Sequence, residues 1–245
     1  MDWRSRERGT RGGRGHRDEE SRDTRLSKSM TYVLRHGASK MGLQMHSDGF
    51  MYVEDLLAHQ QFRSFSLEDV QRVVASDDKH RFKLQAHPDD GRHRIRANQG
   101  HSLQVADLEL KQVAPDDPNC PKEAVHGTYM KHWPSIQSQG LSRMNRTHIH
   151  MAPGIPGEGG VISGMRKNCE LAVYINVPKA IADGIRFFWS ENGVLLTPGD
   201  AGGMLAPCYF SRAQKLKPTG ESPLQLLKLI NIYFFVIILN QTMNS

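Results

Sequence analysis

The sequence predicts an α+β protein with two lobes. Its first region alternates helical patterns with two strands joined by an Asp-Gly turn, and short strand-like runs follow a proline-containing stretch at 115–121. Of the 245 residues, 38% are hydrophobic, which suffices for one large core or two small ones. We expect a disordered Arg/Gly-rich tail at 1–25, a first lobe at 26–110, a second lobe at 111–217 and an atypical apolar tail at 218–245.

The N-terminal tail is rich in arginine and glycine and contains no apolar run. Arg11–Gly15 is typical of segments that hold RNA loosely through phosphate attraction and stacking. A solvated, dispensable tail is the alternative, because the acids at 18–20 and 23 offset much of the charge. The net charge of +6 favours a polyanionic partner, although many proteins with this balance bind no polyanion.

The three cysteines have neither the spacing of a zinc site nor that of a disulfide framework. The basic N-terminus is not followed by the apolar run of a secretory signal or of a spanning helix. We therefore expect a reducing compartment, cytoplasmic or nuclear.

The first lobe is predicted to be winged-helix-like. A helix starts at Asp23 or Thr24 and ends where Gly37 supplies a left-handed residue. Ser66 is placed to cap a later helix, with Asp69 three residues on. The remaining elements expected here are a short strand at 50–53 that leads into 54–59, and a two-stranded wing at 81–85 and 93–96. This fold commonly binds nucleic acid, but a fold alone does not establish a function.

The second lobe is predicted to be richer in strands. Strand-like runs occur at 124–126, 148–151, 170–175 and 194–196, and a helical pattern covers 133–139. The glycine-rich segment 153–160 lacks the Gly-Lys-Ser/Thr ending of a phosphate-cradling loop, so a surface turn is the simpler interpretation.

Three segments far apart in the chain carry cationic groups framed by residues typical of ordered structure. Four candidates for the site stand out: Arg35, His36, Arg81 and Arg146. Converging arginines pack poorly in a core but bind phosphate well, because guanidinium groups stay charged and bind oxygens in a bidentate fork. The pattern predicts an anion-binding site divided over the sequence, and hence a phosphate-handling enzyme.

Six blocks of the sequence occur in the order seen in a known family. They are Leu34–Gly37, Arg81–Phe82, Arg96–Ser102, His126–Thr128, Arg146–His150 and Asn192–Val194. From about Leu26 to about Leu216 the chain resembles the NAD-dependent RNA 2′-phosphotransferases of the eukaryotic type.

The resemblance implies a reaction in two steps that removes the splice-junction 2′-phosphate from ligated tRNA. The RNA phosphate attacks the nicotinamide ribose of NAD and expels nicotinamide, and the neighbouring ribose hydroxyl then attacks the phosphorus. RNA with a free 2′-hydroxyl and ADP-ribose 1″,2″-cyclic phosphate are the products. Arg35, His36, Arg81 and Arg146 would form the catalytic tetrad, with His36 as acid or base because it alone exchanges a proton near neutral pH.

The resemblance also implies an ADP-ribosyltransferase-like second lobe that binds NAD as a consumed co-substrate. The residues expected at NAD are His126, Gly127, Thr128, His148, His150, Ser163, Gly164, Arg166, Asn192 and Gly193. His148 and His150 lie two apart on a predicted strand and share a face, so a metal pair is an alternative; no third ligand is spaced to complete it, and we expect no metal. Many protein-modifying relatives carry a catalytic glutamate near Asn192-Gly193, where this chain has Glu191 before the pair. The absence of a glutamate at that place favours a phosphate acceptor that is already ionised and needs no base to activate it.

The expected partners are NAD and an RNA with an internal 2′-phosphate, most simply spliced tRNA, bound by a monomer. ADP-ribosylation of terminal RNA or DNA phosphates is one competing hypothesis, and a non-catalytic RNA-binding protein is another. The apolar run at 224–239 contains Lys228 and Asn231 and falls short of a bilayer span, so we expect no firm membrane association.

Overall fold

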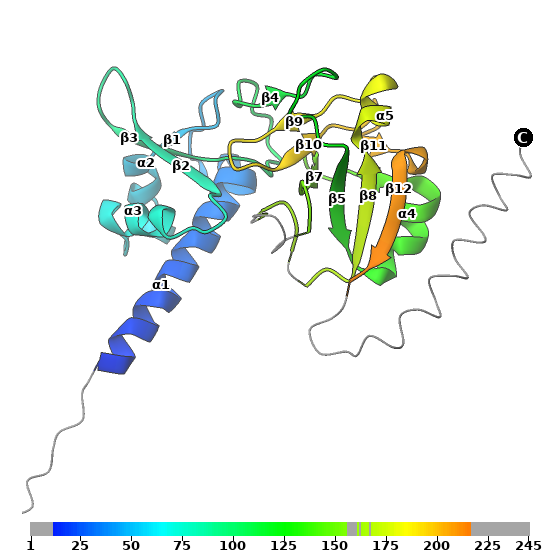
Figure 1. Cartoon of the computed structure of the whole chain (residues 1–245). Helices are drawn as coiled ribbons and strands as arrows, with labels where there is room; N and C mark the ends of the chain where they lie inside the picture. Colours follow the sequence, from blue (N-terminus) through cyan, green and yellow to red (C-terminus); the bar gives the residue numbers. More distant parts are fainter. Residues whose placement is uncertain (1–11, 156–160, 162, 167, 217–245) are drawn as a thin grey trace, which may run out of the picture.

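The computed structural model describes residues 12–155, 161, 163–166 and 168–216. The predicted apolar tail at 218–245, residues 1–11 and most of the glycine-rich segment at 156–160 lie outside the described residues. The described chain is a mixed α+β structure in which two lobes lie side by side (Figure 1). None of its described helices is long and apolar enough to cross a membrane.

The first lobe packs short helices against a small antiparallel sheet. Its sheet has the strand order β1-β3-β2, and its turns include a π-helical turn at Val33–Gly37 and 3₁₀ turns at 39–41 and 60–62. The helices and strands are α1 (Gly12–Tyr32), β1 (Met51–Tyr52), α2 (Val53–Ala58), α3 (Leu67–Ala75), β2 (Phe82–Ala86) and β3 (His93–Ala97). The short strand and the two-stranded wing agree closely with the sequence prediction, whereas helix α2 was not predicted.

One apolar core holds this lobe together. Leu26 and Met30 from α1, Phe62 and Ile95 are fully buried in it. These positions follow the helical and strand periods that the sequence shows. Burying one large apolar side chain stabilises the fold by about 1.5–3 kcal/mol, which explains why the elements form together.

The first helix differs from its prediction at both ends. It begins at Gly12, so the predicted start at Asp23 or Thr24 is wrong, and α1 includes part of the predicted tail. Tertiary ion pairs explain this: Arg22 contacts Asp69 of α3, and Arg72 of α3 donates to both carboxylate oxygens of Asp23 at 2.8 and 2.9 Å. Charges that indicated a solvated tail therefore pair with a neighbouring helix.

Gly37 is not the left-handed stop. The chain passes through the π-helical turn and reaches a left-handed residue only at Gly42, with φ of 67°. A Cβ at Gly37 would lie 2.5 Å from the ring of Tyr32, a half-exposed side chain that would have to move aside. Packing against this ring, not φ, is the constraint on residue size at this position.

The second lobe contains three small antiparallel sheets. Their strand orders are β12-β8-β5, β4-β9-β10-β7 and β11-β6. The elements are β4 (Lys111–Gln112), β5 (Glu123–Thr128), α4 (Trp133–Gln139), β6 (Leu141–Ser142), β7 (Ile149–Met151), β8 (Leu171–Asn176), α5 (Val177–Ala182), β9 (Phe188–Trp189), β10 (Leu195–Thr197), β11 (Met204–Leu205) and β12 (Phe210–Lys215). 3₁₀ turns occupy 130–132 and 207–209.

The core of this lobe lies between its two larger sheets. Ile149, Val173 and Leu195 come from three different strands and are almost completely buried in it. A bridge between Val125 of β5 and Ala152, just after β7, joins the sheets at one edge. The residues after β5 and around β7 are thereby brought next to one another.

The predicted capping box at the start of α3 is confirmed. The Asp69 amide donates to Ser66 Oγ at 3.3 Å, and the Ser66 amide donates to Asp69 Oδ2 at 3.0 Å. These bonds satisfy backbone donors that the first helical turn leaves open.

We expect Ser66→Ala to lower the free energy of unfolding by about 1 kcal/mol, because a capping acceptor is lost. Chemical denaturation of the variant and of the exposed control Ser64→Ala measures the difference. Equal stabilities for the two variants would contradict the role assigned to the cap.

Candidate active site

The π-helical turn carries Arg35 and His36 toward the junction of the lobes. The Ser102 amide donates to the Arg35 carbonyl at 2.9 Å, and the segment before it folds over the Arg35 side chain. Gly100 has φ of 90°, and a Cβ there would lie 3.2 Å from Arg35 Cζ. The backbone at 100–102 therefore encloses this guanidinium, and a side chain larger than hydrogen at Gly100 would crowd it.

Arg35 is a buried cation among other cations. Burial, followed by the charges of Arg146 and Arg81, lowers the pKa of Arg35 to about 10, and Asp77 opposes this shift. Its Nε and Nη2 groups are buried and find no hydrogen-bond partner among the described residues. Buried charged donors are costly when unpaired, so this arrangement calls for an anion.

His36 is poised to exchange a proton. Burial, then the positive charges of Arg146 and Arg35, lower the pKa of His36, so the neutral imidazole predominates at pH 7. Its Nδ1 lies 2.9 Å from Ser102 Oγ, and that hydroxyl also donates to the Arg35 carbonyl at 3.4 Å. Both bonds are satisfied when the proton is on Nδ1, which leaves Nε2 as a proton acceptor.

Arg81 enters the site from the start of β2 and is held by a carboxylate that the sequence analysis missed. Asp77 is 7% exposed; it pairs with the Arg81 guanidinium and accepts a bond from the Arg81 amide. The Arg81 carbonyl accepts from the Asn98 amide at 2.8 Å. An acid four residues before a candidate arginine is the signal that could have revealed this partner.

Arg146 is the member of the tetrad that comes from the second lobe. It precedes β7, and its backbone is fixed by two bonds with Arg143: the Arg146 amide donates to the Arg143 carbonyl at 3.0 Å, and Arg143 Nη1 donates to the Arg146 carbonyl at 2.8 Å. Burial and then the charge of Arg166 lower the pKa of Arg146. The anion site is therefore divided over two lobes as well as over the sequence.

A group of histidines lies beside Arg146. His126 Nδ1 donates to the His150 carbonyl at 2.9 Å, and His150 Nδ1 lies 3.5 Å from Arg146 Nη1. Burial, then the charges of Arg146 and Arg35, hold the pKa of His150 well below its usual range. Burial and then the charge of Arg143 lower the pKa of His148 to about 4, so its ring is neutral at pH 7. Among the residues that the structure describes, His150 Nε2 has no partner.

The remaining predicted cofactor residues gather around the end of β5. A Cβ on Gly127 would lie 2.1 Å from Met165, and one on Gly164, with φ of 96°, would lie 2.8 Å from Ala152 Cα. These glycines let segment 163–166 pack on β5 near Thr128, which is 7% exposed. The predicted residues in this area are His126, Gly127, Thr128, Ser163, Gly164 and Arg166.

The turn at 190–193 brings the last predicted pair to the lobe junction. Asn192 Nδ2 donates to the Lys79 carbonyl at 2.9 Å and to Ser163 Oγ at 3.3 Å, and thus contacts both lobes. Gly193 supplies the left-handed residue of the turn, with φ of 70°. In the described part of the chain, no group of three or more His, Cys, Asp or Glu residues has a geometry able to hold a metal ion.

His101 is a site residue that sequence reasoning did not separate from packing histidines. It is 1% exposed, and neither ring nitrogen finds a hydrogen-bond partner within the described residues. Burial, then the charges of Arg35 and His36, lower the pKa of His101 to about 4. Its carbonyl accepts from the Thr147 amide at 3.0 Å, so it joins the two lobes directly behind the arginines.

The fold and the site together define an α+β protein with a buried cationic cluster to which both lobes contribute. The family model of the RNA 2′-phosphotransferase, Tpt1 / KptA family matches residues 21–199. The chain therefore belongs to this family and is a transferase.

Relatives from animals and yeast match most of the chain. The tRNA 2′-phosphotransferase 1 of Danio rerio is 76% identical over 218 residues, which cover 89% of this chain and 96% of that protein. The protein of the same name from Homo sapiens is 55% identical, covering 89% and 86%. The tRNA 2′-phosphotransferase of Saccharomyces cerevisiae is 32% identical, covering 73% and 80%.

The buried histidine at the junction predicts a pH dependence of stability. An unfolded histidine has a pKa near 6.5, whereas the pKa of folded His101 is about 4, so the unfolded chain binds more protons between these values. Stability is therefore lost as pH falls from about 6.5 to about 4. We expect His101→Gln to reduce this loss by up to about 1.4 kcal/mol per pH unit, measured by denaturation across that range. If the slope of stability against pH were the same in His101→Gln as in the wild type, the His101 ring would have to be exposed to solvent.

Proposed function

We propose that this protein is an NAD-dependent tRNA 2′-phosphotransferase that removes the splice-junction 2′-phosphate from ligated tRNA. Its products would be RNA with a 2′-hydroxyl, nicotinamide and ADP-ribose 1″,2″-cyclic phosphate. The observation that carries the proposal is the buried cluster in which the charges of Arg81 and Arg146 bear on Arg35, whose open donors fit a phosphate dianion. The names of the matched relatives support tRNA as the substrate.

The first lobe would bind RNA as a winged-helix-like module, and the second would bind NAD as an ADP-ribosyltransferase-like module. The donors around β5 and β7 fit NAD: His150 Nε2 is buried without a partner among the described residues, and Arg166 adds positive charge beside Arg146. Bound NAD would supply the electrophilic ribose carbon and nicotinamide as the leaving group. Thr128, Ser163 and the glycines at 127 and 164 would shape its pocket.

The residues of the chain divide the remaining work. The three arginines would gather the RNA phosphate and then stabilise the charge that develops on its oxygens. His36, neutral at pH 7 with Nε2 open to accept, would take and return the proton of the attacking hydroxyl. Glu191 pairs with Lys83 and Arg96, so its carboxylate is engaged away from this role, which agrees with an acceptor that is already ionised.

The decisive assay supplies NAD and an RNA with one internal 2′-phosphate. We expect free 2′-hydroxyl RNA and ADP-ribose 1″,2″-cyclic phosphate in equal amounts. ADP-ribosylated terminal phosphates as the only product would favour the competing transferase reaction, and binding without any product would favour a non-catalytic RNA-binding protein. A terminally phosphorylated RNA without the 2′-phosphate is the matched control substrate.

We expect Arg81→Ala and Arg146→Ala each to lower turnover by about a hundredfold or more, because each removes a charged donor at the developing charge. The melting temperature should change little in Arg146→Ala, since that side chain belongs to neither apolar core, and should fall in Arg81→Ala, where buried Asp77 loses its ion-pair partner. The exposed Arg186→Ala removes the same charge elsewhere and serves as control. Near-normal turnover in either folded site variant would contradict the shared clamp.

A further inference from the structure

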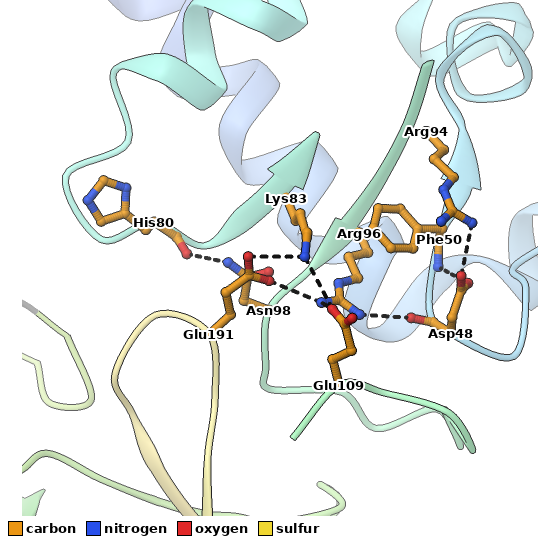
Figure 2. Close-up of polar contacts among 9 residues, drawn as sticks. All are labelled: Asp48, Phe50, His80, Lys83, Arg94, Arg96, Asn98, Glu109 and Glu191. Atoms are coloured by element: carbon orange, nitrogen blue, oxygen red, sulfur yellow. Dashed lines mark hydrogen bonds and ion pairs between the residues drawn. The ribbon is translucent and has the colours of Figure 1, made fainter. Parts of the chain in front are cut away.

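Four charged side chains meet where the lobes join (Figure 2). Lys83 of β2 and Arg96 of β3 are cross-strand partners in the first lobe, so two cations lie side by side. Glu109 of the connecting segment and Glu191 of the second lobe face them. Arg96 Nη2 donates to Glu109 at 2.7 Å and to Glu191 at 3.0 Å, and Lys83 Nζ lies 3.2 Å from each carboxylate.

The buried member of this quartet makes the contact more than a surface ion pair. Arg96 is 1% exposed, its Nη1 also donates to the Asp48 carbonyl at 3.4 Å, and its guanidinium lies 4.8 Å from the Phe50 ring centre. A buried cation depends on its partners, whereas an exposed pair contributes little. Glu191 is thus attached to a fixed point of the first lobe.

The turn that presents Glu191 is itself fixed. Ser190 is 5% exposed; its Oγ donates to Asn192 Oδ1 at 2.9 Å and to the Val194 carbonyl at 3.0 Å. The Val194 amide donates back to Ser190 Oγ at 3.0 Å. Because these hydrogen bonds hold the turn in one conformation, Glu191 moves together with β9 and β10.

The same turn contacts the segment that carries Arg81. Asn192 Nδ2 donates to the carbonyl of Lys79, two residues before Arg81. From the first lobe, Asn98 Nδ2 donates to the His80 carbonyl at 2.8 Å, and His80 is held at φ of 45°, a conformation rare for a non-glycine residue. The backbone before Arg81 is therefore held between the first-lobe sheet and the second-lobe turn.

We propose that the turn Ser190–Val194 is an inter-lobe lock and that Glu191 is a positioning residue for the reaction. By pairing with Arg96 and Lys83, Glu191 fixes the spacing between Arg81 of the first lobe and Arg146 of the second, so that both reach one phosphate. This inference rests on the proposed function and adds a role for a residue outside the catalytic tetrad. Reacting groups misplaced by about 1 Å lose about a hundredfold in rate, so the spacing matters.

The first arm of the test reverses the charges one at a time and then together. We expect Glu191→Lys and Lys83→Glu each to lower kcat for the 2′-phosphorylated RNA by about tenfold to a hundredfold. The double variant restores the attraction between positions 83 and 191 but leaves a lysine facing Arg96, so it should recover only part of the lost kcat. Reversing the exposed pair Lys179–Asp183, which links α5 to the residue that follows it, is the matched control and should leave kcat unchanged.

The second arm measures the spacing of the lobes without any substrate. Spin labels on the exposed Cys208 and on Arg63→Cys report the distance from the second lobe to the first, in a Cys120→Ser background with Cys169 buried. The distance distribution should broaden in each single reversal and narrow again in the double variant. Because this readout needs no activity, it tests the lock even if the wild type fails to release 2′-hydroxyl RNA, the result that would reject the proposed function.

Three results would overturn the lock. If the single variants keep both wild-type kcat and an unbroadened distribution, Glu191 fixes nothing. If the double variant narrows the distribution but recovers no kcat, the Glu191 carboxylate acts in the chemistry itself. If the single variants lose kcat while the distance distribution stays unbroadened, the pair Glu191–Lys83 does not act through the spacing of the lobes. Melting curves of all four proteins identify any variant that fails to fold, and Glu191→Gln then replaces Glu191→Lys with the same expected direction.

Discussion

Mutual repulsion among three guanidinium groups is the constraint on which the rest of the structure depends. Arg35 is buried close enough to Arg81 and Arg146 for both to lower its pKa, and among the described residues two of its donor groups have no partner. Such a cluster is unfavourable unless the surrounding structure enforces it. Asp77, the enclosing backbone at 100–102 and the contacts between the lobes supply that enforcement.

Because the arginine cluster is divided between two lobes, an anion bound at the junction would relieve the repulsion among the guanidinium groups. Two arginines and His36 belong to the first lobe and Arg146 to the second, so a dianion placed between them neutralises repulsion across the junction. The neutral histidines behind them, His101, His148 and His150, keep further positive charge out of the site at pH 7. A phosphate bound at the junction, as proposed, would therefore draw the lobes together around it.

The sequence predicted those features that local chemistry determines. The capping box at Ser66, the wing strands and the strands around the second core follow from residue type and spacing, and the four tetrad positions stood out because cations sat beside ordered segments. The start of α1 was missed because its charges find partners 47 and 49 positions away in α3. Asp77, His101 and Glu191 matter through contacts between segments. The two-residue strands β4 and β9 are defined by their pairing with each other, which periodicity does not reveal.

The most direct test of the account measures recognition of the phosphate without NAD. The ratio of Kd values for one RNA with a 2′-phosphate or a 2′-hydroxyl at the same position isolates that contribution. The wild type should prefer the phosphate strongly, and Arg81→Ala and Arg146→Ala, one from each lobe, should each remove most of that preference because each loses a charge-assisted contact to the same dianion. A preference that survives the loss of either arginine would contradict a single site shared by the two lobes.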